Sequence, residues 1–101
     1  MIFSEFNLTG TSQRELDTEI KYSVASARAD GTELISLRFD DGAFGAVLRI
    51  LRALKRDGVV QFFVSASELA AGKREAEFIL NKYGEYVNYD ENDMGLVFVK
   101  I

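Results

Sequence analysis

Apolar and polar residues follow one another along the chain in blocks that glycines separate, since the sequence has eight glycines and no proline. The first block, residues 2–8, places Phe6 and Leu8 on one face and predicts a strand that ends at Thr9-Gly10. Residues 32–39 are rich in branched and aromatic side chains, so we expect this strand to lie inside the sheet. Residues 59–64 form the most hydrophobic strand and predict a second interior position.

The segment between the first two strands, residues 13–30, fits either a helix or a hairpin. Four of its apolar residues recur at helical spacing, whereas three alternate as they would in a strand. Ser12 and Glu15 fit a capping box, in which the serine accepts from the amide three residues on and the glutamate reaches back. Gly31 stands where a helix end favours a left-handed residue. We predict a helix, with a hairpin that turns at residues 29–32 as the alternative.

Two further helices are predicted. The first of them covers residues 43–56, with Asp41 as its N-cap. The other covers residues 66–83 and follows a second capping-box pattern, Ser65 with Glu68. The helix over residues 43–56 has an apolar stripe made of Phe44, Val47, Leu48, Leu51 and Leu54.

The last third of the chain completes the expected fold. Gly72 interrupts the helix over residues 66–83, which can therefore be two pieces. Residues 85–89 and 96–101 predict two strands, joined as an antiparallel hairpin by a polar turn. Alternating strands and helices imply parallel pairing, and the hairpin makes the sheet mixed. We predict a single α/β domain over residues 1–101, a two-layer sandwich of order βαβαβαββ with a mixed five-stranded sheet and three helices.

The composition excludes several kinds of chemistry within this chain. The 101 residues are 48% hydrophobic and 28% charged, as in an ordinary globular domain, and include no cysteine and no histidine. Disulfides, thiolate catalysis, zinc-cysteine sites, Ser-His-Asp triads and histidine-zinc hydrolases are therefore excluded. The net charge of −4 argues against broad nucleic-acid or membrane contact. With no signal peptide, transit peptide or membrane-length apolar run, we expect a cytoplasmic protein without cofactor or metal.

A basic stripe on the second predicted helix is the favoured binding site. Arg49, Arg52 and Arg56 recur at intervals of three and four, which places them on one helical face, about 110° from the centre of the apolar stripe. Lys55 flanks the helix end, and Lys73 with Arg74 can add to this patch. Guanidinium groups in a row can bind phosphates or an acidic partner, although cations near a helix C-terminus are also favourable on a solvated face.

Four other groups of residues have chemistry of interest but are better explained as structure. Asp40 and Asp41 follow a buried strand and offer the oxygen ligands that magnesium prefers, yet they also fit a strand end and a helix cap. Glycine turns can bind anions, acidic turns can bind cations and tyrosines can stack bases. Ordinary turns and packing account better for these three groups, which are residues 9–12 with 42–45, residues 90–93, and Tyr83, Tyr86 and Tyr89.

The order of motifs resembles a known family. A strand ending in FNLTG, a long helix, a strand, a glycine-bearing turn and a helix with AVLRILRAL, residues 46–54, resemble the small MutS-related (Smr) domain over roughly residues 5–65. That family has a leucine-aspartate-leucine-histidine-glycine motif after its first strand and a histidine-glycine-x-glycine turn before its second helix. Here Thr9 replaces the first histidine, and LRFDDGAFG, residues 37–45, lacks the second. The matching positions are Gly10, Gly42 and Gly45.

The Smr resemblance implies an architecture like the C-terminal domain of translation initiation factor three, together with nucleic-acid binding or nicking. Nicking is not expected, because the histidines are absent. Our leading hypothesis is a non-enzymatic binding or regulatory domain that uses Arg49, Arg52 and Arg56 for a protein partner, or that self-associates through an open sheet edge. The alternative is a nucleic-acid-binding domain of Smr-like architecture with the same arginines. A third hypothesis is a magnesium-dependent phosphate-handling enzyme built on Asp40 and Asp41.

Overall fold

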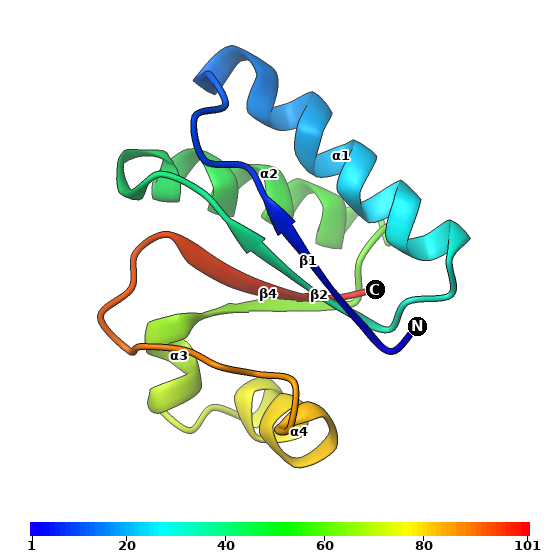
Figure 1. The fold of residues 1–101 in the computed structure, drawn as a ribbon, viewed down its shortest axis with the longest axis vertical. Coiled ribbons are helices and arrows are strands. Elements are labelled where there is room, and N and C mark those ends of the chain that lie inside the picture. The colour runs from blue at the N-terminus through cyan, green and yellow to red at the C-terminus, as the bar shows by residue number, and fades with distance from the viewer.

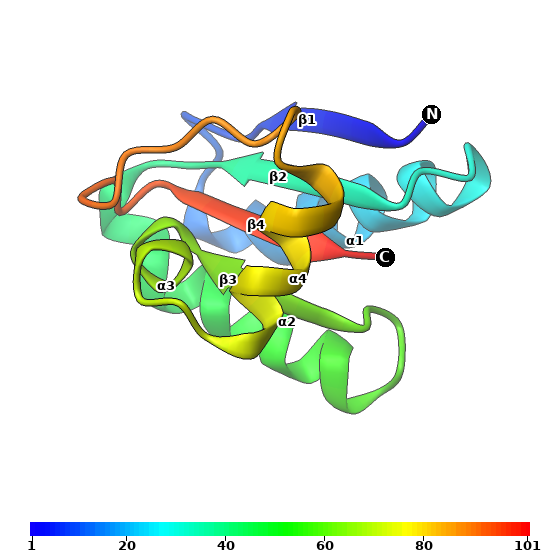
Figure 2. The ribbon, with the colours of Figure 1, turned by 90° about the horizontal axis from the view of Figure 1, so that it is seen from below.

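The computed structural model describes all 101 residues and has one mixed sheet with helices on both faces (Figures 1 and 2). Four strands and four α-helices are present, instead of the predicted five strands and three helices. The elements in chain order are β1 (Phe3–Asn7), α1 (Gln13–Ala29), β2 (Leu34–Arg38), the 3-10 helix η1 (Asp41–Ala43), α2 (Phe44–Arg56), β3 (Phe62–Ser65), α3 (Ala66–Ala70), α4 (Arg74–Tyr83) and β4 (Leu96–Lys100).

The last strand lies inside the sheet and not in a terminal hairpin. The strand order is β1-β2-β4-β3, with β1 parallel to β2 and β4 antiparallel to both β2 and β3. The predicted strand over residues 85–89 is wrong, because this segment pairs with no strand. β4 instead finds partners on both sides, which satisfies its backbone groups and buries all five of its residues. The mixed character of the sheet and the interior position of β2 are confirmed.

The sheet is covered on both faces, so the fold has three layers and the predicted two-layer sandwich is wrong (Figure 1). Successive residues of a strand point to opposite faces. Because β2 and β4 are apolar on both faces, each face needs its own cover. α1 and α2 pack on the face that carries Ile35 and Val97, whereas α3 and α4 pack on the face that carries Leu34 and Phe98.

The expected helices form, but only one expected capping contact does. Residues 13–30 contain helix α1 and no hairpin. Ser12 is the N-cap of α1, yet its side chain makes no capping hydrogen bond. The expected cap Asp41 lies in η1, so the residue before α2 is Ala43. The expected third helix is two helices, because Gly72 takes a φ of +72°, which interrupts helical geometry.

β3 is an edge strand, and the prediction of an interior position is wrong. It has four residues, of which Phe62 and Phe63 are half-buried. The hydrophobic run at residues 59–64 matches an interior strand, but β4 occupies that place in the sheet. The outer side of β3 therefore faces no other strand, and α2 and the α3–α4 connection lie on either side of it (Figure 2).

The connection from α4 to β4 depends on a glycine. The Gly95 carbonyl accepts a hydrogen bond from the Phe39 amide at 2.9 Å, and a Cβ at Gly95 would lie 2.4 Å from the Phe39 carbonyl oxygen. Only glycine permits this approach, which guides β4 into the gap between β2 and β3. No helix in the structure has both the length and the apolar character needed to cross a membrane.

Candidate functional site

The largest cavity of the molecule runs along the open side of β3. This cavity, the basic groove, has a volume of about 570 Å³ and lies between α2, β3 and the α3–α4 connection. Its lining carries four cations and two carboxylates, and so has two net positive charges in a chain whose net charge is −4. The lining residues are Leu48, Arg52, Lys55, Arg56, Phe62, Phe63, Val64, Glu68, Lys73 and Glu75.

The amphipathic pattern of α2 positions the groove cations. Its apolar side is buried against the sheet, so the opposite side points to solvent beside the β3 edge. Arg52 and Arg56 line the groove together with Lys55. Arg49 is exposed on the same helix but does not line the groove. Arg56 forms an exposed ion pair with Asp57, with 3.3 Å between Nε and Oδ1. Arg52 forms no ion pair, so its positive charge is the less neutralised of the two groove arginines.

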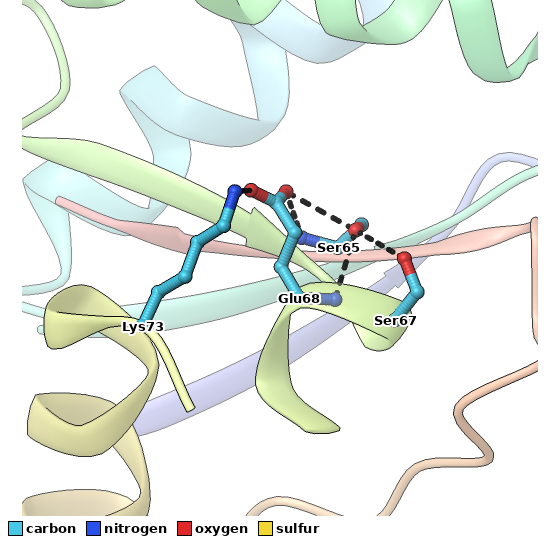
Figure 3. A network of polar contacts seen from close by, with 4 residues as sticks. All are labelled: Ser65, Ser67, Glu68 and Lys73. Atoms are coloured by element: carbon cyan, nitrogen blue, oxygen red, sulfur yellow. Dashed lines mark hydrogen bonds and ion pairs between the residues drawn. The ribbon is translucent and has the colours of Figure 1, made fainter. Parts of the chain in front are cut away.

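A polar network holds the opposite wall of the groove (Figure 3). Lys73 Nζ lies 3.1 Å from Glu68 Oε2, and Glu68 Oε1 accepts hydrogen bonds from the Ser65 amide and hydroxyl, each at 3.1 Å. The Glu68 amide donates to Ser65 Oγ at 3.4 Å, which completes the predicted capping box of α3. The network thus fixes Glu68, and Glu68 in turn holds the ammonium of Lys73 at the groove.

The electrostatics of the network keep Glu68 ionised. Burial disfavours the carboxylate, but the hydrogen bonds from Ser65 and the positive charge of Lys73 outweigh it, so the pKa of Glu68 lies below its ordinary value of 4.5. The ion pair with Lys73 offsets the charge of the carboxylate, which reduces its repulsion of an approaching anion. Glu75 is the other carboxylate of the groove and is half-buried.

Two phenylalanines of β3 add flat apolar surface to the groove. Since strand side chains alternate, Phe62 packs against the α3–α4 core and Phe63 against the α1–α2 core, so the groove passes over the strand edge. Phe62 meets Phe78 edge to face, with 5.9 Å between the ring centroids and 82° between the ring planes. Cationic groups therefore lie beside half-buried aromatic rings at an open strand edge.

Sequence reasoning found the cations of this site but not its aromatic floor. Helical spacing predicts Arg52, Lys55 and Arg56, and Lys73 is an expected flanking cation. The predicted interior position of residues 59–64 instead hides Phe62 and Phe63. Their exposure depends on the strand order, for which no local sequence signal exists.

The paired aspartates have a structural role. Asp40 Oδ2 accepts a hydrogen bond from the Gly10 amide at 2.9 Å, which joins the turn after β1 to the turn after β2. Both glycine turns therefore meet at one end of the sheet, and the carboxylate occupies the amide that an anion would need. No group of three or more acidic, cysteine or histidine side chains is assembled to hold a metal ion. Strand ends and turns account for these residues, as the sequence favoured.

The acidic turn also stabilises itself. Asp90 Oδ1 accepts from the Asn92 amide at 2.9 Å, and Asp93 Oδ1 accepts from the Gly95 amide at 2.8 Å. Asp93 Oδ2 lies 2.8 Å from Arg38. The hydrogen bond from Gly95, opposed by burial and aided by Arg38, lowers the pKa of Asp93. This segment is a hydrogen-bonded turn that leads into β4.

Each of the three tyrosines makes a packing contact. Tyr83 is buried, and its hydroxyl donates to Glu33 Oε1 at 2.8 Å. Tyr86 is stacked against Phe3, with 6.0 Å between the ring centroids. Tyr89 packs against the α3–α4 core. None of the three lines the basic groove.

Comparison with known proteins identifies the fold. No protein family matches the sequence, and no curated protein is similar to it. A crystal structure of the Smr domain of Thermus thermophilus MutS2 is similar to the whole domain, with a TM-score of 0.59 and 23% sequence identity. The match covers 96% of this chain and 95% of the other. The resemblance noted in residues 5–65 is confirmed, and it is a likeness of fold that extends over the last helices and β4.

Proposed function

We propose that this domain binds a single-stranded segment of nucleic acid in the basic groove. The observation that carries the proposal is the placement of Arg52, Lys55 and Arg56 beside Phe62 and Phe63 along an open strand edge. Proteins that bind single strands combine a basic groove that follows the phosphates with aromatic rings on which bases stack. Unpaired bases are needed for that stacking, which favours a single strand over a duplex.

The likeness of fold supports the same proposal. The Smr resemblance implies nucleic-acid binding, and it extends over the complete domain. Nicking is not part of the proposal, because Thr9 stands where the family has histidine and the chain has no histidine elsewhere. The net charge of −4 then limits contact to the groove, since the rest of the surface repels phosphate.

A protein partner at the same place is less well supported. The open edge of β3 is the feature that strand pairing with a partner or a second copy would use. β3 is only four residues long and is bordered by exposed cations, and both properties oppose edge-to-edge pairing. An oligonucleotide uses the cations and rings without requiring a long strand edge.

The test measures fluorescence anisotropy of labelled ten-nucleotide strands and of the matching duplex. Three phosphate contacts give a slope of about −2 for the logarithm of affinity against the logarithm of salt, so raising sodium chloride fourfold weakens single-strand binding about 20-fold. Arg52→Glu removes one contact and reduces the steepness of the slope by about 0.7. Arg14→Glu makes the same charge change on α1, outside the groove, and is the matched control.

Two results would contradict the proposal. One is an affinity that does not change with salt. The other is equal loss of binding in Arg52→Glu and Arg14→Glu, since this would reflect net charge and not the groove. A strand that binds no more tightly than the duplex would restrict the proposal to contacts with phosphates.

A further inference from the structure

A second cavity lies on the sheet face that α3 and α4 cover only in part. This cavity, the sheet pocket, has a volume of about 340 Å³ and lies over β1 and β2. The segment after α4 passes along these strands (Figure 2). Two of its residues line the pocket on the side away from the sheet. Tyr86 and Asn88 come from that segment, and β1, β2 and β4 supply the floor. A cavity of this size is at the lower end of the range for small-ligand sites.

The floor of the sheet pocket is polar where the rest of this sheet face is apolar. Glu5 is paired in register with Ser36, and Asn7 with Arg38, so four polar residues form a square on one face. Leu96 and Phe98 of β4, which also belong to the core under α3 and α4, form the apolar side of the pocket. Ser36 is only 5% exposed, and its hydroxyl makes none of the side-chain hydrogen bonds of the fold. The oxygen itself is not fully buried and opens to the pocket, so this hydroxyl is available to contact a ligand there.

The groups around the pocket define the ligand that fits. The Glu5 carboxylate can only accept hydrogen bonds, whereas the Arg38 guanidinium can only donate them. Asp93 contacts the Arg38 guanidinium at 2.8 Å and thereby orients it. Tyr86 and Phe3 lie 6.0 Å apart between centroids with 25° between their planes, which gives one wall a flat aromatic surface. These features fit a flat, neutral heterocycle that carries both donors and acceptors.

We propose that the sheet pocket binds cytosine, a nucleobase that has both an amino group and a carbonyl. The amino group donates to Glu5, and the carbonyl accepts from Arg38, in the way these side chains pair with bases elsewhere. The ring lies against Tyr86 or Phe3. Phosphate adds little affinity, because Glu5 places negative charge at the pocket and the charge of Arg38 is already paired with Asp93. The base can belong to a free nucleoside or to a nucleic-acid strand.

The experiment is an amide NMR titration of the whole chain with cytidine, uridine, cytidine monophosphate and inorganic phosphate. Cytidine is expected to shift the amides of Ser36, Arg38 and Tyr86 and to bind at least about ten times more tightly than uridine, which lacks the amino group. Cytidine monophosphate is expected to bind no more tightly than cytidine. Inorganic phosphate is expected to leave these amides unmoved.

A variant pair tests the contact with the base. Glu5→Gln keeps the shape of the exposed side chain but removes its charge, and is expected to weaken cytidine binding about ten-fold with little effect on uridine. Glu15→Gln makes the same change on the exposed part of α1 and is the control. Equal binding of cytidine and uridine, or binding unaffected by Glu5→Gln, would overturn the proposal.

The source of the base is distinguished by a short cytosine-containing oligonucleotide. If the base belongs to a strand, the oligonucleotide shifts the pocket amides at lower concentration than cytidine does. If the ligand is a free nucleoside, the oligonucleotide shifts only amides near Arg52. The inference does not rest on the basic groove, since cytidine binding in the sheet pocket is measured without any strand. Absence of pocket shifts with every compound overturns it, whatever happens at the groove.

Discussion

The capping box of α3 allows the most direct test of how the basic groove is held. α3 has only five residues, so its first turn depends strongly on the bonds between Ser65 and Glu68. Replacing an N-cap serine by alanine typically costs about 1 kcal/mol, and the 3.4 Å bond from the Glu68 amide to Ser65 Oγ places this site in the lower half of the usual range. We expect Ser65→Ala to lower the unfolding free energy by about 0.5–1 kcal/mol and the melting temperature by roughly 2–8 °C.

The companion variant Glu68→Gln separates charge from hydrogen bonding. Its amide oxygen can still accept from the Ser65 amide, but its interaction with Lys73 loses the ionic part. Since the folded pKa of Glu68 is below its ordinary value of 4.5, the stability from its charge is complete above that value and is lost as the pH falls through the folded pKa. The wild type should therefore lose stability between about pH 5 and pH 3 more steeply than Glu68→Gln does.

The assay is urea unfolding followed by circular dichroism at pH 7, 5, 4 and 3. Glu77→Gln is the matched control, because Glu77 is exposed in the first turn of α4. If Ser65→Ala unfolds at the same urea concentration as the wild type, the capping box does not hold α3. If Glu68→Gln and the wild type lose stability in parallel on acidification, the proposed origin of the lowered pKa is refuted.

Three further predictions concern the core and its polar margin. Phe98→Ala should lower the free energy of urea unfolding by about 3–5 kcal/mol, since Phe98 is 1% exposed in an interior strand. A decrease below about 1 kcal/mol would contradict this interior position. Gly95→Ala should lower the melting temperature, because its Cβ would lie 2.4 Å from a backbone carbonyl oxygen, whereas Gly45→Ala, with open space around it, should not. Tyr83→Phe should raise the pKa of Glu33 measured by carboxyl NMR, because the Tyr83 hydroxyl is the largest cause of its lowering, and an unchanged pKa would exclude that cause.

Local patterns in this sequence predicted local structure well. In residues 13–30, the helical spacing of the apolar residues predicts the structure correctly and the strand-like alternation does not, because helix α1 forms there. The pattern of Ser65 with Glu68 predicted the start of α3, although the same pattern at Ser12 forms no capping bond. The same local signal therefore had two outcomes, since the tertiary surroundings of each serine differ.

Strand order could not be obtained in the same way. Residues 59–64 and 96–101 are both hydrophobic enough for the interior of a sheet, and local sequence does not decide which of them occupies it. The structure places β4 there and leaves β3 at the edge. The edge position of β3 also leaves Phe62 and Phe63 partly exposed in the basic groove. The sequence therefore predicts the arginines of the groove but not its aromatic residues.

The interior position of β4 has a consequence for how the domain folds. β1 and β2 pair directly with each other, so β1, α1, β2 and α2 can begin to assemble while the chain is still short. β3 pairs with no strand other than β4, and Leu34 must find Lys100 across most of the chain. Pairings between residues far apart in sequence slow folding because a long loop must close first. We therefore expect β3 to join the sheet only once β4 is in place, so that the strand edge of the basic groove forms late in folding.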